Sequence, residues 1–571
     1  MPETKHQRLL KLKGQLEDER SSFVPHWRDL SDFILPRRAR FSITDQNRGD
    51  RRNQKIIDST ATLASRTLRS GMVAGLTSPA RPWFRLSLPD TDMAEFGPIK
   101  DWLHLVTQLM STMFLRSNIY QSLPNVYGDM GNFATGCLFV DEDFQNVLHS
   151  YVFPTGSYCI STDEKGRVRV FSRELRMTVR QLVMMFGQYD QKTGRPMWEH
   201  FSETVKNLWD RSMYETWIDV AHIIQPNDEW DPQKSHNKFK KYSEHYFELS
   251  SNQNQLKPDF NRFLRESGRD IFPVLCPRWD TTFGDVYGTD CPGMTALGDV
   301  KQLQSEQKRK AQGLEQTVKP AMVGPTAMRN VRASILPGDI TYTDERDGTK
   351  GFRRAFDIRL DLAALTNDIQ EIRHIIKRAY YEDLFLMLAQ TDRREITARE
   401  IDERKEEKLL ALGPVLEQTN QDMLDPLIDL AYEYMAGQGL LPPPPPELDG
   451  QDLKVEYISV MAQAQKLIGV STLERFSSFA GQVASLDARA AKKVRWDEVI
   501  DDYGERSGVN PKIIRSDEEV DKLMSAEAQA QQQAAAAEQI QGGAKVAKDL
   551  ANAKLEDDSA LKRILQTQGA A

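Results

Sequence analysis

Residues 291–318 have the sequence CPGMTALGDVKQLQSEQKRKAQGLEQTV, and residues 361–379 have the sequence DLAALTNDIQEIRHIIKRA. Both segments repeat apolar side chains three and four residues apart, which is the spacing of one face of a helix. In the first segment this stripe is Leu297, Val300, Leu303, Gln307, Ala311, Leu314 and Val318, and in the second it is Leu365, Ile369, Ile372, Ile375, Ile376 and Ala379. The two segments therefore predict a pair of amphipathic helices at the centre of the chain.

The ends of this helix pair are also predicted by the sequence. Lys319-Pro320 ends the first helix, because the residue before a proline is pushed out of the α region. The second helix opens near Asp361. The residues between the two helices carry strand and turn signals. Considered alone, this pattern fits two core helices joined by a β-hairpin.

Length and composition indicate a soluble protein of several domains. The chain has 571 residues, of which 40% are hydrophobic and 28% are charged. A chain of this length predicts about three or four domains. The formal net charge is -8 at pH 7, which argues against tight, charge-driven binding of duplex DNA over the whole surface. A weak or sliding contact with DNA stays open.

The four cysteines, Cys137, Cys159, Cys276 and Cys291, show no CxxC spacing. Without paired histidines as well, they predict no zinc site and a reduced compartment. Residues 1–20 are polar and charged, unlike a signal peptide. No apolar run approaches the roughly 20 residues that a membrane span needs. We therefore expect no metal, no cofactor and no membrane partner.

An arginine cluster follows the first predicted element, which is one amphipathic helix over residues 5–33. The cluster lies between residues 37 and 52 and consists of Arg37, Arg38, Arg40, Arg48, Arg51 and Arg52. Such a cluster is typical of nucleic-acid patches. The more ordinary interpretation of such a cluster is a solvated loop or a salt-bridged contact between subunits, and we favour it here.

Residues 56–290 predict further helices and an antiparallel sheet. Asp58 or Ser59 can cap a helix rich in small residues, which ends before Ser78-Pro79 and suits close helix packing. Residues 100–135 predict two more helices, and residues 179–186 a short one. The strand patterns cover residues 83–88, 137–143, 150–160, 168–177, 214–225, 240–250 and 272–279. The fold class is therefore predicted to be α+β.

The second half of the chain predicts a loop, a long helix and a helical tail. Residues 390–395 form a short polar loop, and Thr397 to Glu400 is a capping box that starts the helix. That helix runs to about Met435, and Gly413-Pro414 and Asp425-Pro426 should kink it or divide it into pieces. Five prolines at residues 442–446 favour a stiff spacer. Residues 516–568 suit either a long exposed helix or disorder.

Catalytic signatures are absent from the sequence. It contains no phosphate-binding loop of the G-x-x-x-x-G-K-[ST] type, no G-x-S-x-G elbow and no H-E-x-x-H motif. The nine histidines are scattered, and no pair of acidic residues stands out. We therefore expect the protein not to be an enzyme.

Several separated motifs together resemble the podovirus (T7-like) head-to-tail connector, or portal, protein family. They agree with it in order and spacing over roughly residues 5–440. The motifs are IDST at residues 57–60, RSGM at 69–72, TSP at 77–79, Trp83-Phe84, PRW at 277–279, Tyr287-Gly288 and TAREI at 397–401. The resemblance implies a ring, usually of twelve subunits, at one vertex of a capsid, through which double-stranded DNA is packaged and ejected.

The resemblance also implies a division into the parts of a portal subunit, in which the crown is mainly helical and a C-terminal barrel is one option for its tail. These parts are a wing at residues 1–290, a first stem helix at 291–318, a clip at 319–361, a second stem helix at 362–381, a tunnel-loop region at 382–396, a long wing helix with the proline spacer at 397–446 and a crown at 447–571. The tunnel loop here is short and has no glycine, so a large moving loop is not expected.

The site residues implied by this resemblance fall into two groups. The predicted DNA-channel residues are Arg393, Arg394, Lys301 and Lys308. The predicted clip residues, which would meet the packaging motor and the tail adaptor, are Arg329, Arg332, Asp339, Tyr342, Arg346 and Lys350. The implied partners are further copies of the chain in a homododecameric ring, double-stranded DNA, the terminase large subunit, tail adaptor and nozzle proteins, and the major capsid and scaffolding proteins. The implied location is the portal vertex of the virion, after assembly in the host cytoplasm.

Two other interpretations remain at this point. The first is an oligomeric, scaffold-like assembly protein without a DNA channel, which would share the amphipathic helices. The second is a nuclease or another DNA-processing enzyme. It would need a metal-binding cluster of carboxylates, and the sequence does not show one.

Overall fold

The computed structural model divides the chain into two compact units, Met1–Gln465 and Lys466–Ala571. The structure describes residues 3–45, 47, 49–90, 93, 97–188, 197–249, 262–323, 353–354, 361–389, 412–448, 453–459, 461–462, 476–483, 492–507, 520, 522–527 and 529. In the second unit, the described residues include helix α17 (Trp496–Ser507).

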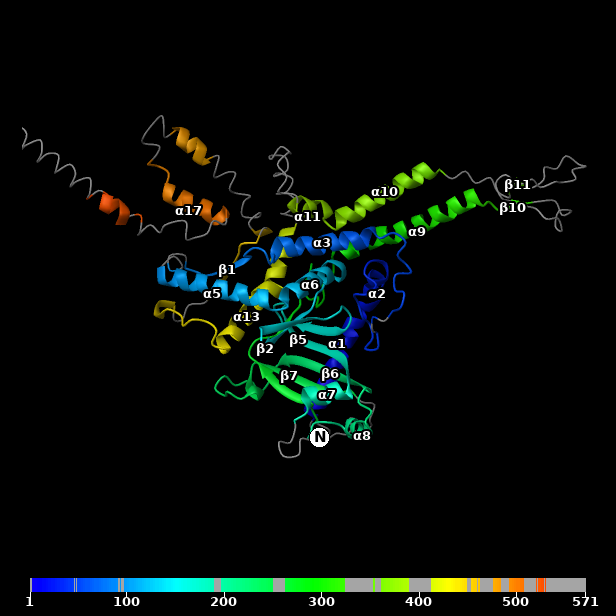
Figure 1. Cartoon of the computed structure of the whole chain (residues 1–571), viewed down its shortest axis with the longest axis horizontal. Coiled ribbons are helices and arrows are strands. Elements are labelled where there is room, and N and C mark those ends of the chain that lie inside the picture. The colour runs from blue at the N-terminus through cyan, green and yellow to red at the C-terminus, as the bar shows by residue number, and fades with distance from the viewer. Residues whose placement is uncertain are drawn as a thin grey trace, which may run out of the picture. The chain divides into compact units, whose positions relative to one another are not determined.

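The first unit combines helices with antiparallel sheets, which confirms the α+β prediction (Figure 1). The helices are α1 (Lys5–Ser21), α2 (Val24–Phe33), α3 (Thr60–Leu76), α5 (Gly97–Arg116), α6 (Ile119–Phe133), α7 (Val179–Phe186), α8 (Glu203–Asp210), α9 (Pro292–Val318), α10 (Leu362–Ala379), α11 (Glu382–Ala389) and α13 (Asp425–Gly437). Short 3-10 helices lie at Asn237–Phe239 (η1) and Pro446–Leu448 (η5).

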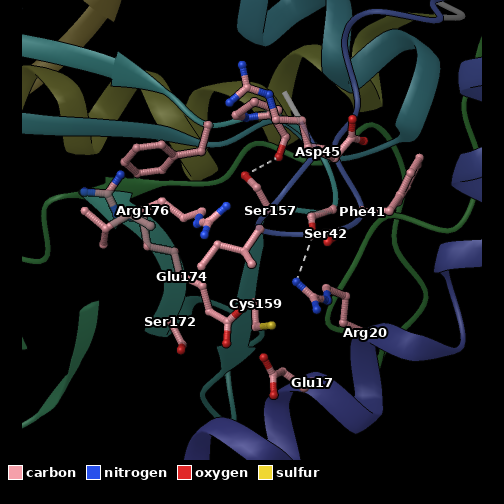
Figure 2. A pocket seen from close by; sticks show the side chains of 17 residues that line it. Glu17, Arg20, Phe41, Ser42, Asp45, Ser157, Cys159, Ser172, Glu174 and Arg176 are labelled. Atoms are coloured by element: carbon pink, nitrogen blue, oxygen red, sulfur yellow. Dashed lines mark hydrogen bonds between the residues drawn. The ribbon is translucent and has the colours of Figure 1, made fainter. Parts of the chain in front are cut away.

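A five-stranded antiparallel sheet forms the largest β element. It has the order β4 (Tyr158–Thr162), β5 (Val168–Thr178), β6 (Trp217–Pro226), β7 (Tyr242–Glu248) and β8 (Arg265–Arg269). The turn between β4 and β5 contains Gly166, which supplies its positive φ of 73°. A cavity of about 250 Å³ opens beside β4 and β5, against α1 and the segment Arg40–Asp45 (Figure 2).

A second sheet has the order β3 (Val147–Val152), β2 (Leu138–Asp143) and β9 (Val274–Leu275). The strand predicted over residues 272–279 is therefore shorter in the structure, where only Val274 and Leu275 form strand β9. A separate two-stranded sheet pairs β1 (Phe84–Ser87) with β12 (Lys454–Tyr457). This pairing places β12, which lies beyond the proline run, in the same unit as the first helices. The predicted boundary between spacer and crown at residues 446/447 stays a prediction.

The main hydrophobic core lies where α3, α5, α6 and the three-stranded sheet meet. Glycines let the helices approach closely there, as the small-residue pattern of residues 56–72 suggested. A Cβ atom at Gly131 of α6 would lie 2.6 Å from a methyl group of Leu68 in α3. A Cβ atom at Gly71 of α3 would lie 2.1 Å from the ring of Phe385 in α11. Both contacts need glycine at these positions.

The prediction of one helix over residues 5–33 is wrong. The structure has two helices, α1 ending at Ser21 and α2 starting at Val24. Pro25 lies in the first turn of α2. A proline is tolerated there because the first amides of a helix have no intrahelical acceptor, whereas inside a continuous helix it would remove a hydrogen bond. The apolar periodicity continues across the break, so it could not reveal the break.

The central helix pair is confirmed. Helix α9 ends at Val318, directly before Lys319-Pro320. Helix α10 is capped by Asp361, whose carboxylate accepts hydrogen bonds from the amides of Ala363 and Ala364 at 3.0 Å each. The two helices lie side by side (Figure 1), and β10 (Met322–Val323) pairs antiparallel with β11 (Arg353–Arg354) beyond their ends.

Burial changes sharply along α9. In its first half Ala296, Val300 and Leu303 are buried. In its second half, which continues the same predicted stripe, Leu314 is 40% exposed and Val318 is 77% exposed. The outer half of α9 therefore carries apolar side chains that the described residues do not cover.

The predicted change in the long helix is confirmed at Asp425-Pro426, whereas residues 412–419 are α-helical through Gly413-Pro414. A π-helical segment, η4 (Asn420–Leu424), directly precedes α13. Pro426 has no N–H group to continue the α-helical hydrogen bonds, so the backbone must change its pattern immediately before it. The capping box at Thr397 lies outside the described residues.

Candidate functional site

The base of the α9–α10 pair is joined to the start of α3 by the carboxylate of Asp58. Its Oδ1 accepts hydrogen bonds from the Thr60 amide at 2.9 Å and the Thr60 hydroxyl at 2.5 Å. Its Oδ2 accepts from Gln307 Nε2 of α9 at 3.0 Å and from both Nε and Nη2 of Arg373 of α10, at 3.1 and 2.6 Å. One side chain thus contacts three helices.

The backbone beside Asp58 is held by a second side chain of α9. Gln304 Oε1 accepts from the amides of Ile57 and Asp58 at 2.7 Å each, and Gln304 Nε2 donates to the Asp58 carbonyl at 2.9 Å. Gln304 is buried. Because buried backbone groups need partners, this glutamine satisfies three of them at once. It fixes the segment before α3 against α9.

Burial and hydrogen bonding act in opposite directions on the Asp58 carboxyl. Burial alone raises its pKa, but the hydrogen bonds from Thr60 and Arg373 outweigh that effect, so the pKa of Asp58 lies below its ordinary value. The carboxylate is therefore ionised near neutral pH. The ion pair with Arg373 is largely shielded on the aspartate side, where 6% of the side chain is exposed.

Close packing completes the base of the helix pair. Gly293, in the first turn of α9, lies against α6, where a Cβ atom would come within 2.7 Å of the Asn132 carbonyl oxygen. The Asn132 side chain accepts from the Tyr380 hydroxyl at 2.9 Å and donates to Ser65 Oγ at 2.8 Å. All three partners are buried. This chain of contacts joins α6, α3 and the end of α10.

A further buried ion pair holds the segment that leads into α9. Arg278, from the PRW motif, donates from Nε and Nη2 to the two carboxylate oxygens of Asp422, at 3.0 Å each. Arg278 Nη2 also donates to the Gly166 carbonyl at 2.7 Å. Only 4% and 10% of the two side chains are exposed. The pair fixes the π-helical segment η4 to the β4–β5 turn.

The Tyr287-Gly288 motif has a packing role. The Tyr287 hydroxyl accepts from the Ile160 amide at 3.1 Å, and its ring lies against Phe23 and Trp27. A Cβ atom at Gly288 would come within 2.3 Å of the Ala134 carbonyl oxygen. The motif therefore packs the approach to α9 against both the sheet and the first helices.

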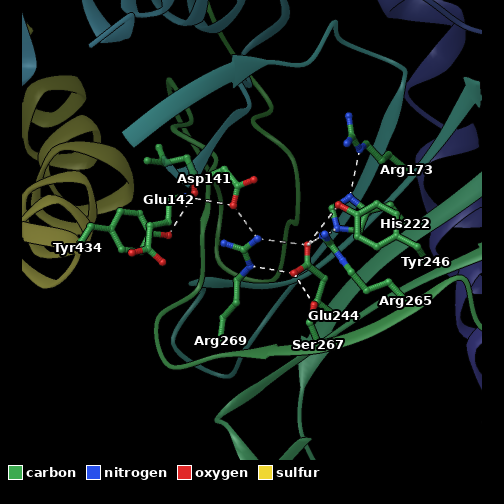
Figure 3. A network of polar contacts seen from close by, with 11 residues as sticks. Asp141, Glu142, Arg173, His222, Glu244, Tyr246, Arg265, Ser267, Arg269 and Tyr434 are labelled. Carbon is green, nitrogen blue, oxygen red and sulfur yellow. Dashed lines mark hydrogen bonds and ion pairs between the residues drawn. The ribbon is translucent and has the colours of Figure 1, made fainter. Parts of the chain in front are cut away.

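The most concentrated group of titratable side chains lies inside the body, between its two larger sheets (Figure 3). Glu244 on β7 accepts from Arg269 Nε and Ser267 Oγ, each at 2.9 Å, and lies 2.9 Å from His222 Nε2. Arg269 Nη2 also donates to Asp141 on β2 at 2.8 Å. Arg269 thus bridges the five-stranded and three-stranded sheets.

The contacts of His222 define its protonation. Arg173 Nε donates to Nδ1 at 3.2 Å, so Nδ1 is unprotonated and the proton is on Nε2, facing Glu244. Burial lowers the pKa of His222 to about 4. His222 is 0% exposed and Glu244 is 1% exposed. No substrate can reach the pair, so its role is to hold the sheets together.

The predicted channel residues have different surroundings. Lys301 Nζ lies 2.6 Å from Asp29 Oδ2 and over the ring of Phe33, so its charge is already neutralised within the chain. Lys308 is exposed, and no described carboxylate lies within ion-pair distance of it. The remaining predicted site residues, Arg393, Arg394, Arg329, Arg332, Asp339, Tyr342, Arg346 and Lys350, lie outside the described residues. The channel and clip assignments stay predictions.

The part of the chain that the structure describes holds no group of three or more metal-ligating side chains. Among the same residues, no helix is both long and apolar enough to cross a bilayer. The four cysteines are buried and unpaired.

Sequence reasoning missed the polar residues that hold the base together. Gln307 appeared in the predicted apolar stripe of α9 without an assigned role. A glutamine in such a stripe indicates a buried polar contact, and this was the available signal. Gln304 and Arg373 gave no signal of their own, because their partner Asp58 lies about 250 and more than 300 residues away in sequence.

Comparisons with known proteins agree with this architecture. The family model described as "Bacteriophage head to tail connecting protein" matches residues 6–514. The chain belongs to that family. It is 46% identical over 570 residues to the "Portal protein" of Salmonella phage epsilon15, with 100% of both chains covered. It is 40% identical over 559 residues to the "Probable portal protein" of Bordetella phage BPP-1, with 98% of both chains covered.

The resemblance seen in the separated motifs is thereby confirmed, and the protein has the function of a phage head-to-tail connector, or portal. Proteins of this kind are structural components of the virion. The motif residues Asp58, Gly71, Arg278 and Tyr287 have structural roles, because each of them joins elements of the fold.

Proposed function

We propose that this chain forms a ring, of twelve copies as in the resemblance, whose α9 and α10 helices surround a channel for double-stranded DNA at one capsid vertex. The observation that carries the proposal is the change of burial along α9, from buried Leu303 to exposed Leu314 and Val318. Ile375 of α10 is also 43% exposed. Apolar side chains at the surface of a helix pair favour contact with another copy.

Within this proposal, residues 1–290 and 397–446 form the wing and its spacer, α9 and α10 form the stem, residues 319–361 form the clip, 382–396 the tunnel-loop region and 447–571 the crown. The tightly fixed base at Asp58 supports the assignment of α9 and α10 as a stem. A helix pair that lines a passage for DNA must keep its position under load.

Lys308, Arg393 and Arg394 are the basic residues that we assign to the channel. Lys301 is the weaker member of the predicted set, because Asp29 already neutralises it. A few arginines and lysines on an otherwise acidic protein allow weak, sliding contact with phosphates rather than tight binding.

The clip residues Arg329, Arg332, Asp339, Tyr342, Arg346 and Lys350 are assigned to docking of the terminase large subunit during packaging and of the tail adaptor and nozzle proteins afterwards. The major capsid and scaffolding proteins complete the set of proposed partners. Assembly takes place in the host cytoplasm in this proposal. Residues 319–361 lie between α9 and α10 in the sequence, which supports their assignment as the clip.

The decisive experiment measures particle mass and symmetry of the purified protein by native mass spectrometry and negative-stain imaging, with and without its scaffolding protein. A closed ring of about twelve copies, with a hole wide enough for a duplex of roughly 20 Å, supports the proposal. A chain that stays monomeric with the scaffold present contradicts it.

Two variants test the finer assignments. Replacing Arg393 and Arg394 together by alanine should reduce DNA packaging or retention, and unchanged packaging rejects their place in the channel. Deleting residues 325–350 should abolish binding of the packaging motor to the ring. Rings that still bind the motor after this deletion reject the clip assignment.

A further inference from the structure

The cavity beside β4 and β5 is lined by charged groups from three parts of the chain. Figure 2 shows Glu17 and Arg20 reaching it from α1, and Glu174 and Arg176 from β5. The segment that carries Arg40 and Asp45 forms another wall. The cavity has a volume of about 250 Å³, which is room for several water molecules or for a small polyatomic ion.

The carboxylates that line the cavity already have cationic partners. Glu17 and Glu174 share Lys13, at 2.8 and 2.6 Å. Asp45 pairs with Arg52 at 2.5 Å. These three acidic groups therefore do not neutralise the arginines of the cavity.

Three of the four lining arginines form no ion pair with the described residues. Arg176 pairs with Asp219 at 2.9 Å. In contrast, no carboxylate of the described residues lies within ion-pair distance of Arg20, Arg40 or Arg173, although Arg173 is attracted by the more distant Glu244. The cations in and around the cavity therefore outnumber the anions. The cations are Arg20, Arg40, Arg173, Arg176, Lys13 and Arg52, and the anions are Glu17, Asp45, Glu174, Asp219 and Glu244.

The hydrogen-bonding capacity of these arginines is also unfilled. Arg20 donates from one Nη to the Gly156 carbonyl at 2.8 Å, and Arg173 donates to His222. The Nε groups of Arg20 and Arg40 are buried, and neither has an acceptor within the described part of the chain. Two charged side chains at the cavity therefore keep hydrogen-bonding capacity that the described part of the chain does not use.

The position of Arg40 is fixed by the backbone. The Arg40 amide donates to the Thr155 carbonyl at 2.9 Å. Gly156 has a φ of 87°, and a Cβ atom there would come within 2.5 Å of the Arg40 carbonyl oxygen. The turn at Pro154–Ser157 thus needs a glycine to let the Arg40 segment approach. Backbone contacts of the fold therefore fix this wall of the cavity.

We infer that this cavity is an oxyanion-binding site, in which Arg40 and Arg20 bind a phosphate or carboxylate group. Guanidinium groups present forked N–H donors that match the paired oxygens of these anions. The chain carries 83 acidic and 75 basic residues, so a second copy offers many carboxylates as ligands. The ligand source is either a free oxyanion or such a carboxylate, and the latter alternative rests on the ring proposed above.

The test is isothermal titration calorimetry of the unassembled chain with inorganic phosphate and with citrate, in a chloride buffer. We expect binding to the unchanged protein. The substitution Arg40→Gln should weaken phosphate and citrate binding by about tenfold or more, because it removes a charge-assisted hydrogen-bond donor. Arg51→Gln is the matched control, because Arg51 is an exposed arginine of the same cluster outside the cavity.

Folding is checked separately by circular dichroism. If Arg40→Gln does not fold, Arg40→Lys replaces it in the titration, because lysine keeps the positive charge but lacks the paired N–H donors of the guanidinium group. Absence of phosphate and citrate binding to the unchanged chain overturns the inference. Equal binding by the Arg40→Gln and Arg51→Gln variants overturns it too. These measurements need no ring, so their failure is distinct from a failure of the proposed function.

The same titration on assembled rings identifies the source of the ligand. If rings bind phosphate as the unassembled chain does, the ligand is a free oxyanion. If rings no longer bind it, and Arg40→Gln shifts the population from rings to monomers, the ligand is a carboxylate of the neighbouring copy.

Discussion

Asp58 and Glu244 are two buried carboxylates with contrasting surroundings. Asp58 lies at the base of α9 and α10, and its contacts come from three helices. Glu244 lies within the five-stranded sheet, and its contacts come from Arg269, Ser267 and a neutral histidine. The Arg373 side chain that pairs with Asp58 is 32% exposed, whereas the Arg269 side chain that pairs with Glu244 is 16% exposed.

The two carboxylates therefore have different structural roles. Glu244 and its partners hold the two sheets together, whereas Asp58 and its partners hold α9 and α10 in position. The polar network around Glu244, here called the sheet network, is shielded from solvent. Removing one member therefore leaves a buried charge that water cannot solvate. At the base of α9 and α10, the Arg373 side chain is partly exposed to solvent. Water can therefore replace some of its hydrogen bonds if they are lost. We therefore expect the sheet network to govern the stability of the body, and the helix base to govern the position of α9 and α10.

Arg269→Met should have the largest effect. It leaves Glu244 buried with only the more distant Arg265, at 4.0 Å, as an arginine partner, and it also breaks the bridge to Asp141. This should destabilise the first unit by about 3–5 kcal/mol. Thermal unfolding followed by circular dichroism should show a drop in Tm of about 3–5 °C, because the unfolding entropy of a unit of this size is large. Lys55→Gln breaks the exposed pair with Asp32 and is the control, with almost no change expected. Equal shifts for both variants would refute the contrast.

The sheet network should also weaken in mild acid. Burial lowers the pKa of His222 to about 4, below its ordinary 6.5, so the unfolded state binds the proton more readily than the folded state. Stability from this group is therefore present above pH 6.5 and is lost as pH falls toward 4, by about 2–3 kcal/mol in all.

Asp58 behaves differently, because its pKa is lowered from 3.8 and its contribution is lost only as pH falls below that value. Melting curves of the unchanged protein and of His222→Asn between pH 7 and 4 test this difference. The variant should lose part of the pH dependence in that window, because burial also lowers the pKa of His245, to about 3, and His245 acts in the same direction. A profile that His222→Asn leaves unchanged would show that other groups cause it.

Arg373→Gln should have a smaller effect on stability, about 1–2 kcal/mol, because solvent screens part of this pair. Its local effect should be larger. Hydrogen exchange at the amides of Ile57 and Asp58 should accelerate, since the base of the helix pair opens more often. Lys377→Gln, on the exposed side of the same helix, is the control. Unchanged exchange in the Arg373 variant would mean that Gln304 and Gln307 suffice to hold the base.

Leu314→Ser should have the smallest effect on the isolated chain, within about 0.5 kcal/mol, because this side chain is 40% exposed. It should nevertheless reduce the fraction of protein in rings, as measured by native mass spectrometry. Leu303→Ser, at a buried position of the same helix, should instead lower Tm strongly. Full ring formation by Leu314→Ser would remove the outer half of α9 from the proposed subunit contact.

Local patterns predicted much of the fold. Lys319-Pro320 placed the end of α9 correctly, and Thr178 with its capping-box partner Gln181 starts α7 at the expected residue. The strand pattern over residues 168–177 matches β5 within one residue. In each case the deciding residues are neighbours in sequence.

Contacts between distant residues were beyond such patterns. The pairing of Arg278 with Asp422 spans 144 residues, and that of Arg373 with Asp58 spans 315. A single arginine among 75 basic residues gives no sign of its partner. The site residues in the tunnel loop and clip came from the family resemblance, and they stay predictions.

The sheet formed by β1 and β12 has a consequence for synthesis of the protein. Arg85 and Glu456, which face each other in this sheet, are 371 residues apart. At about 5–20 residues per second on the ribosome, β1 waits roughly 20–70 s for its partner. During that time the nascent chain carries an unpaired strand edge next to Trp83 and Phe84, which is a template for wrong association. Truncations before residue 454 should therefore aggregate, and slow translation should make this protein dependent on chaperones.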